Sequence, residues 1–425
     1  MEQKFYPQVG ETFYKTKLPC GLTVAVLPRP GFTKKLCYFV ADFGAIHTSF
    51  TMDGKDYTVP AGVAHYLEHK LFDMPGRDVV EEFSSLGAVP NAFTGYDMTA
   101  YYFSCTEHFY ENLRLLLEFV TTPYFTEESV AKEQGIIGQE IGMNEDSPEN
   151  RLFELLMGAM YEKHPIRIPI LGTRESIARI TPQVLTDCHR AFYRPENMLL
   201  CVVGDVDADE IARIAQNMLK DIPSPSVTAV RSWDEQLTVS TPAVAQQMEV
   251  AMPMFHLGFK CAPLPNGSEG VRGEIIGDLA AEALFGESSP LYLKLYEQGL
   301  IDASFGGGFE TVEGMAMLTC TGDSEEPQAV RDAILEQAKI LAEAGVTETD
   351  FLRMKRSALG RRIRNMDSFD STCFRICAYH FSQFDYFCIP DIYGQVTCED
   401  IRQFIQTVIT PDNMCMAVIY PKEET

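Results

Sequence analysis

RPENMLLCVV at residues 194–203 returns as TPDNMCMAVI at residues 410–419. The two stretches lie 216 residues apart, and Thr181 and Thr397, which open the helical stretch before each of them, are separated by the same interval. A third, weaker repeat relates GQEI at residues 138–141 to GRRI at residues 360–363. A repeat of this length predicts two duplicated domains rather than the short units of a solenoid.

Each copy mixes strand-like and helical segments. Residues 22–26 and 36–41 are rich in β-branched and aromatic side chains, residues 107–121 and 127–143 favour helices, and each copy ends on an apolar strand. Because strict βαβ alternation is missing, the pattern predicts an α+β fold with two duplicated domains, each a mainly antiparallel sheet packed with helices.

The stretch PSPS at residues 223–226 marks the end of the first copy. We therefore expect an N-terminal domain at residues 1–222, a linker at 223–243 and a C-terminal domain at 244–425. A chain of 425 residues with 46% hydrophobic and 22% charged residues fits a folded protein of two or more domains.

The bulk properties exclude several classes of function. A net charge of −25 argues against a nucleic-acid partner and suits basic peptides, although solubility alone would also explain it. No run of 18 or more apolar residues is present, so no membrane span is expected. The twelve cysteines form no CxxC pair and the N-terminus is polar, so we expect reduced thiols and a cytoplasmic protein.

The run HYLEH at residues 65–69 carries the clearest chemistry. On a helix, His65 and His69 share a face and can reach one metal ion, and Glu68 lies on the same side. A carboxylate there can act on a water that a metal has acidified. The alternative is a pair of surface or core histidines without a ligand. The second copy lacks the motif, since aligning residues 71–72 with 284–285 places Asp278, Ala281 and Glu282 at the three positions.

A second acidic helix offers the missing ligand. Glu133 and Glu140 are seven residues apart, nearly two helical turns, and so lie on one face. Their apolar neighbours Ile136, Ile137 and Ile141 indicate a partly buried helix. The alternative here is an ordinary amphipathic helix with solvated acids.

Together these features resemble the pitrilysin/insulinase family of inverted-motif zinc peptidases, and most closely its short bacterial members in the mitochondrial-processing-peptidase-like branch. The resemblance covers essentially the whole chain. It also includes the Gly62 and Ala64 lead-in, NAFT at residues 91–94, TAYY at 99–102, TRESI at 173–177 and YRPENM at 193–198.

The resemblance implies a zinc-dependent endopeptidase with Zn²⁺ as cofactor. His65, His69 and Glu140 would be the metal ligands, Glu68 the general base and Glu133 a supporting carboxylate. It also implies that an edge strand carries the substrate-binding residues Asn91, Ala92, Phe93 and Thr94, beside which a peptide can pair.

One part of the family pattern is missing. Tyr296 stands where relatives carry an arginine, and Asp302 or Ala303 where they carry a tyrosine. The expected partner is therefore a related subunit that supplies this pair in a heterodimer and closes a chamber around the peptide, or a second copy of the chain with Lys294 standing in. The substrates would be unfolded, basic-leaning peptides or leader segments. The alternatives are a non-catalytic scaffold subunit and, less consistent with a motif that has no cysteine, a structural zinc domain.

Overall fold

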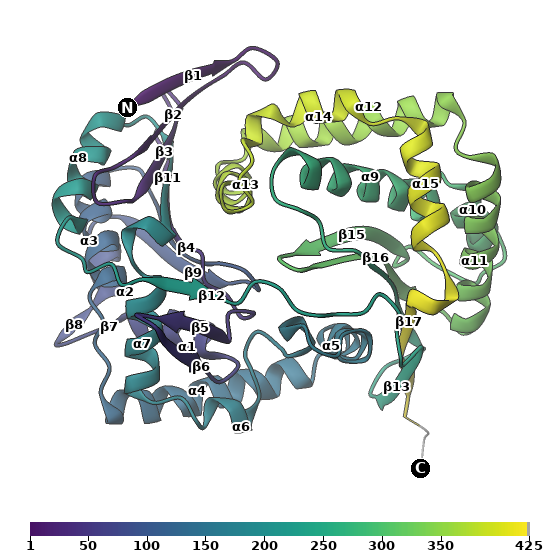
Figure 1. Ribbon diagram of the computed structural model, residues 1–425, viewed down its shortest axis with the longest axis horizontal. Helices are drawn as coiled ribbons and strands as arrows, with labels where there is room; N and C mark the ends of the chain where they lie inside the picture. Colours follow the sequence, from purple (N-terminus) through teal and green to yellow (C-terminus); the bar gives the residue numbers. More distant parts are fainter. Residues whose placement is uncertain (423–425) are drawn as a thin grey trace. The chain divides into compact units, whose positions relative to one another are not determined.

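A computed structural model describes residues 1–422, which form two compact units. Unit 1 comprises Met1–Ile141, Pro169–Val230 and Ile363–Cys388. Unit 2 comprises Gly142–Ile168, Arg231–Arg362 and the residues from Ile389 onward. Each unit is built on its own sheet (Figure 1).

The sheet of unit 1 has seven strands in the order β1-β2-β3-β11-β4-β10-β9. Only β3 and β11 pair in parallel; the other neighbours are antiparallel. The strands are β1 (Glu2–Tyr6), β2 (Glu11–Lys17), β3 (Thr23–Pro28), β4 (Lys35–Ala41), β9 (Ala88–Thr94), β10 (Thr99–Cys105) and β11 (Met198–Gly204). Every residue of β11 is buried, as its apolar sequence predicts for a central strand.

Helices cover both faces of this sheet. α3 and α8 lie on one side and α13 on the other, against β4 and β11 (Figure 1). The helices of this unit are α1 (Val63–Leu71), α2 (Val79–Ser85), α3 (Phe109–Thr121), α4 (Glu127–Glu145, which runs past the end of the unit), α6 (Arg174–Ile177), α7 (Pro182–Phe192), α8 (Ala208–Leu219) and α13 (Phe369–Phe381). Short strands complete it: β5 (Ser49–Met52), β6 (Lys55–Thr58), β7 (Asp73–Met74), β8 (Arg77–Asp78) and β12 (Val227–Ala229).

The sheet of unit 2 has five strands in the order β13-β17-β14-β16-β15. Its strands are β13 (Ala243–Met248), β14 (Met254–Cys261), β15 (Gly306–Val312), β16 (Met315–Asp323) and β17 (Met414–Pro421). β13 and β17 pair in parallel and the rest antiparallel, which is the pattern of β3-β11-β4-β10-β9 in unit 1. The helices are α5 (Pro148–Met160), α9 (Ser268–Phe285), α10 (Pro290–Glu297), α11 (Pro327–Ala344), α12 (Glu348–Arg364), α14 (Ile389–Gln395) and α15 (Cys398–Val408).

The shared pattern confirms the predicted α+β fold in two similar parts. Thr181 caps α7 and Thr397 caps α15, each through its side chain, so the 216-residue interval is also an interval between equivalent helix starts. The segments expected to be strands at 22–26 and 36–41 are β3 and β4, and the two expected helices are α3 and α4.

The compact units differ from the linear domains predicted at residues 1–222 and 244–425. α5, from the first copy, packs on β14 and β17 of unit 2, and α13, from the second copy, packs on β4 and β11 of unit 1. The exchange places Cys373 of α13 beside Cys201 of β11, with 3.9 Å between the two sulfur atoms. All twelve cysteines are free thiols in the structure.

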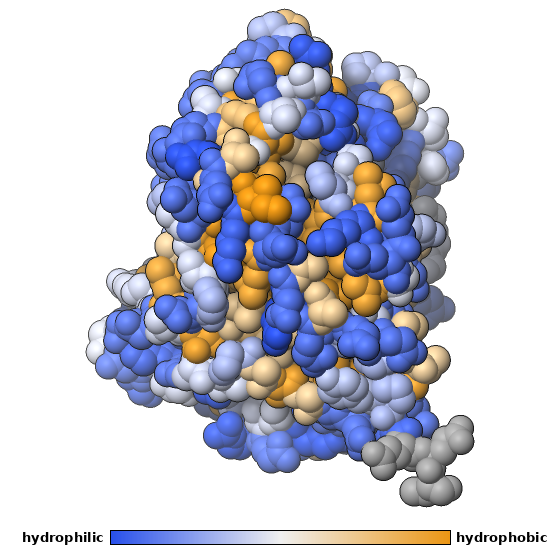
Figure 2. All heavy atoms as spheres, turned by 90° about the vertical axis from the view of Figure 1, so that its right-hand side faces the viewer, coloured by the Kyte–Doolittle hydropathy of each residue, from blue (hydrophilic) through white to orange (hydrophobic). Residues whose placement is uncertain are grey.

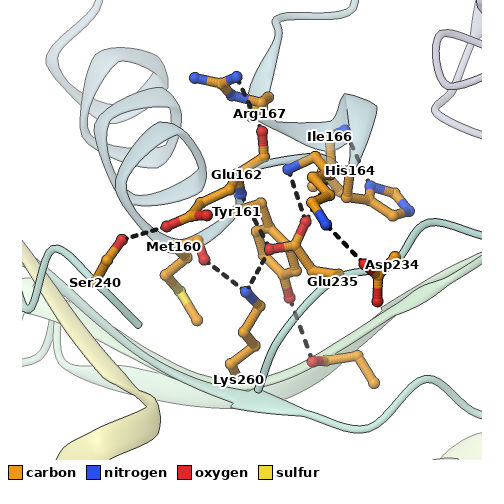
Figure 3. Close-up of polar contacts among 12 residues, drawn as sticks. Met160, Tyr161, Glu162, His164, Ile166, Arg167, Asp234, Glu235, Ser240 and Lys260 are labelled. Carbon is orange, nitrogen blue, oxygen red and sulfur yellow. Dashed lines mark hydrogen bonds and ion pairs between the residues drawn. The ribbon is translucent and has the colours of Figure 1, made fainter. Parts of the chain in front are cut away.

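The expected linker at 223–243 is partly built into the units. β12 pairs with β5 in unit 1, while Glu235 enters unit 2 and is buried there (Figure 3). Its carboxylate accepts hydrogen bonds from the backbone N–H groups of Glu162, Lys163 and His164. It also forms an ion pair with buried Lys260, at 2.8 Å. Burial alone would raise the pKa of Glu235, but Lys260 and the three N–H groups lower it to about 2.

The outer helices of unit 2 are mostly hydrophilic. Figure 2 looks onto the side where α10 and α11 lie, and its apolar residues are interrupted by polar ones; Leu293 and Ile340 are exposed examples on these helices. Within residues 1–422, no helix combines the length and the apolar character that a bilayer crossing requires.

Candidate metal centre

Helix α1 begins at a turn that only glycines can form. Gly62 precedes the helix with φ of 88°, and a Cβ atom there would lie 2.4 Å from the carbonyl oxygen of Leu171. Gly172 approaches the carbonyl of Ala61 as closely, and the Ser176 hydroxyl donates to that carbonyl at 2.8 Å. Residues 171–176 therefore fix where α1 starts, which explains why TRESI accompanies the metal motif.

α1 carries the motif residues against α4. Tyr66 and Leu67 are fully buried in the core of unit 1, and the Tyr66 hydroxyl donates to the backbone carbonyl of Val130 on α4. Burying these two side chains turns His65, Glu68 and His69 to the helix face that borders α4 and β9. The register between the two helices is thus set by apolar packing and one buried hydrogen bond.

Three candidate ligands converge. His65 Nε2 lies 3.5 Å from Glu140 Oε1, and His69 Nε2 lies 3.6 Å from Glu140 Oε2. One ligand atom from each of the three residues lies within 4.8 Å of the other two. The predicted residues His65, His69 and Glu140 are therefore brought together by the fold.

The donor set fits zinc. With metal–ligand bonds of about 2.0–2.2 Å and tetrahedral angles, two ligand atoms stand about 3.4 Å apart. The observed separations of 3.5 and 3.6 Å are close to this value and longer than a good N–H···O hydrogen bond. Two imidazoles and one carboxylate leave room for a fourth group, as catalytic zinc sites require.

Glu133 holds one of the imidazoles. Its Oε1 lies 2.9 Å from His69 Nδ1, and its side chain is 14% exposed. A proton on Nδ1 that bonds to this carboxylate leaves the Nε2 lone pair free to face Glu140. His65 has no such support: among residues 1–422, its buried Nδ1 has no hydrogen-bond partner.

Glu68 makes a different contact. Its Oε2 accepts a hydrogen bond of 2.5 Å from the Thr94 hydroxyl, at the end of β9. Burial raises the pKa of Glu68, and the Thr94 hydroxyl and the two histidines offset part of that rise. A carboxylate with a raised pKa is suited to accept a proton and return it.

The other ionisable groups respond to one another. The nearby His65 imidazole holds the pKa of Glu140 below its usual value. Burial would lower the pKa of His69, but the hydrogen bond and charge of Glu133, with Glu68 and Glu140 nearby, raise it overall. The site is thus rich in negative charge, which favours a cation.

β9 is one of the two edge strands of the unit 1 sheet, and among residues 1–422 it pairs with β10 alone. Because side chains alternate along a strand, Ala92 and Thr94 share the face toward α1, whereas Asn91 and Phe93 share the other. Phe93 packs there near Tyr38 and Phe374, at ring-centroid distances of 6.4 and 5.9 Å. Of the four predicted substrate-binding residues, Thr94 hydrogen-bonds to a motif side chain, that of Glu68.

The equivalent helices of unit 2 carry ion pairs instead. Arg362 of α12, the counterpart of Glu140, bonds to Glu274 and to Asp278 of α9 at 2.7 and 3.0 Å. Glu282, the counterpart of His69, lies 3.4 Å from Arg361. Tyr296, where the sequence resemblance leads us to expect an arginine, is exposed on α10 and stacks on Tyr292.

Two contacts of the site were not foreseen from the sequence. The Thr94–Glu68 hydrogen bond joins residues 26 positions apart on different elements, and the Ser176–Ala61 bond joins residues 115 apart. The stretches NAFT and TRESI were part of the family resemblance in the sequence, but they did not indicate which residues would be in contact.

Comparison with known proteins gives matches to two family models. The model described as Insulinase (Peptidase family M16) matches residues 54–174, and that described as Peptidase M16 inactive domain matches residues 179–358. The second range contains α9, where the HxxEH motif is missing.

Relatives match over the whole chain. A Bacillus subtilis (strain 168) protein named Uncharacterized zinc protease YmfH is 38% identical over 427 residues, covering 98% of both chains. Another from that organism, Uncharacterized zinc protease YmxG, is 26% identical over 73% of this chain and 76% of its own.

Solved structures agree in fold. The crystal structure of a putative M16-like peptidase from Alicyclobacillus acidocaldarius has a TM-score of 0.92 and 30% identity, and covers 97% of this chain and 99% of its own. A protease from Helicobacter pylori has a TM-score of 0.81 at 18% identity, covers 96% of this chain and 99% of its own, and so shows the fold alone.

Proposed function

The chain belongs to the insulinase family of peptidases (peptidase family M16), and from this premise we propose that it is a zinc-dependent endopeptidase that cleaves peptides or leader segments. The convergence of His65, His69 and Glu140 within 4.8 Å, with Glu68 on the same helix as the histidines, is the observation that carries the proposal.

His65 Nε2, His69 Nε2 and one oxygen of Glu140 would hold the metal. Zinc bound there supplies Lewis-acid activation of a water molecule and of the scissile carbonyl. Glu133 orients the His69 ring through Nδ1, at 2.9 Å. The chain itself contributes the ligand geometry and the surrounding negative charge.

Glu68 would move the protons. Its Oε2 is engaged by Thr94, and no other side chain among residues 1–422 donates to its carboxylate, so Oε1 is the acceptor for a proton of the attacking water. The same oxygen then returns the proton to the departing amine nitrogen. The raised pKa of Glu68 supports this exchange, because it makes the carboxylate a better proton acceptor than an ordinary glutamate.

β9 would bind the substrate backbone. Among the described residues its outer edge has no partner strand, and an extended peptide can add there as a further antiparallel or parallel strand. The Asn91 carboxamide accepts the Ala92 N–H in the unliganded chain and would give way to a peptide carbonyl.

The decisive experiment compares wild type with Glu68→Gln on unstructured basic peptides, with zinc content measured in both. We expect the variant to keep its metal and to lose about 10³-fold in kcat. Ser357→Ala, an exposed site on α12, serves as an unaffected control. Equal cleavage by wild type and Glu68→Gln would exclude this mechanism.

A partner subunit belongs to the same proposal. By the family resemblance, Tyr296 replaces the expected arginine and Asp302 or Ala303 the expected tyrosine, so we propose that a related chain supplies this pair in a heterodimer that encloses the peptide. The net charge of −25 suits basic peptides in such an enclosure. Activity that appears only on mixing with an Arg/Tyr-bearing relative would support this arrangement.

Other outcomes define the alternatives. Full activity of the purified chain at the mass of a homodimer would favour self-association. Absence of cleavage with partner and zinc would favour a scaffold subunit. Cytoplasmic residence is also proposed, on the twelve free thiols, and alkylation of those thiols in intact cells tests it.

A further inference from the structure

Thr94 makes the one side-chain hydrogen bond that the carboxylate of Glu68 accepts within the described chain. The donor is the Thr94 Oγ1–H and the acceptor is Glu68 Oε2, at 2.5 Å. Such charge-assisted O–H···O bonds are short and about twice as strong as neutral ones. One carboxylate oxygen is therefore held, and rotation of the group about its last bond is restricted.

The backbone of Thr94 is itself well fixed. It pairs with Thr99 of β10 at the end of the strand, and the following Gly95 donates its N–H to Met98 at 2.8 Å. Ala45 and Ile46 in turn donate their N–H groups to Gly95 and Tyr96, which ties this turn to the chain after β4. As a β-branched residue, Thr94 also has few side-chain rotamers.

Thr94 is placed where two parts of the proposed reaction meet. Its main chain continues the edge of β9, along which the peptide would pair, and its hydroxyl reaches the proton acceptor on α1. A single residue thus sets the distance between the bound strand and Oε1 of Glu68. Displacement of a reacting group by about 1 Å can cost 10²-fold in rate.

We propose that Thr94 is a positioning residue: its hydroxyl holds Oε2 of Glu68 so that Oε1 faces the attacking water. The proposal rests on the proposed peptidase function. It assigns no bond-making step to Thr94, which neither loses its proton nor ligates metal. The role requires the hydroxyl and not the β-methyl group.

The test compares Thr94→Val, which keeps the shape and removes the hydroxyl, with Thr94→Ser, which keeps the hydroxyl. For Thr94→Val we expect kcat to fall about 10- to 100-fold, while the Kd of an uncleaved peptide and the zinc content remain within about twofold of wild type. Thr94→Ser should recover kcat to within about fivefold. Thr121→Val, which removes a hydroxyl bonded to Leu117 on α3, is the matched control.

Two further readouts separate positioning from general damage. The melting temperature of Thr94→Val should match that of Thr121→Val, and its crystal structure should show Glu68 in a rotamer different from wild type. Wild-type kcat in Thr94→Val, or a Glu68 side chain that has not moved, overturns the positioning role and leaves the peptidase function standing. Equal activity of wild type and Glu68→Gln overturns both.

Discussion

The same pair of helices carries opposite chemistry in the two units. In unit 1, α1 and α4 bring two imidazoles and a carboxylate together, whereas in unit 2, α9 and α12 bring Asp278 and Glu274 to the guanidinium of Arg362. Glu140 and Arg362 occupy equivalent positions in the repeated GQEI and GRRI stretches.

This difference teaches that the scaffold and the site are separable. The five-strand pattern and the helix positions survive in both units, but the polar groups between the helices are satisfied in different ways. In unit 1 the Glu140 carboxylate faces two histidines, and the three side chains together can bind a cation. In unit 2 the arginine is itself the cation, so no metal is needed to balance the acids.

The strongest test of the comparison is His65→Ala. We expect the zinc content of the purified chain to fall from about one equivalent to near zero, because two remaining ligands do not make a stable site. Elemental analysis after desalting measures it. The control is Asp278→Ala at the equivalent place on α9, which should keep wild-type zinc; unchanged metal in His65→Ala would remove His65 from the ligand set.

The ion pairs of unit 2 can be broken in the same way. Arg362→Ala removes the guanidinium that forms ion pairs with Glu274 and Asp278, and because this guanidinium is only 13% exposed, we expect a loss of about 3 kcal/mol in the free energy of unfolding. Urea denaturation measures it. Arg353→Ala, which breaks an exposed pair with Asp350 on the same helix, should cost no more than about 0.5 kcal/mol. Similar losses in the two variants would contradict the assigned role of Arg362.

Glu133→Gln examines the support of the metal centre. Removing the charge beside His69 Nδ1 should weaken zinc affinity about 10- to 100-fold without abolishing binding. Competition with a chromogenic chelator gives the affinity, and Glu128→Gln, in the exposed first turn of α4, is the control. A zinc affinity of Glu133→Gln equal to that of wild type would show that Glu133 does not support the metal site.

The stabilisation of unit 2 by the Glu235 ion pair is expected to depend on pH. The pKa of Glu235 is about 2 in the folded chain, below its ordinary value of 4.5, so its ion pair stabilises the fold above about pH 4.5. That stability is lost as pH falls toward 2, because the folded form must then take up the proton. We expect the stability difference between wild type and Glu235→Gln to shrink by about 1–2 kcal/mol between pH 5 and pH 3. A difference independent of pH would exclude a charged Glu235 as the anchor.

Much of the site was visible in the sequence because its spacing obeys helix geometry. His65 and His69 lie one turn apart, and Glu133 and Glu140 lie two turns apart on the helix that faces them. The mixture of strand and helix segments predicted the α+β architecture, and the duplication predicted equivalent helix starts at Thr181 and Thr397, which the structure shows to be helix caps.

Contacts between elements were not visible. The sequence repeat says where a copy begins, but not which sheet its last helices cover, so the exchange of α5 and α13 between the units was not predicted. Thr94 was expected to bind substrate, and its bond to Glu68 depends on the strand register that places β9 beside α1. Glu235 was assigned to the linker because a single acidic residue in the sequence does not indicate that three backbone N–H groups will donate hydrogen bonds to it.

The position of α13 in unit 1 has a consequence for biosynthesis. The strands β4 and β11 are complete when the ribosome has made residue 204, but the helix that lies against them spans residues 369–381. More than 160 further residues must therefore be synthesised before α13 can cover the Cys201 side of this sheet. During that interval an apolar surface is open to chaperones or to wrong pairing, and folding of the metal-bearing half finishes late in translation.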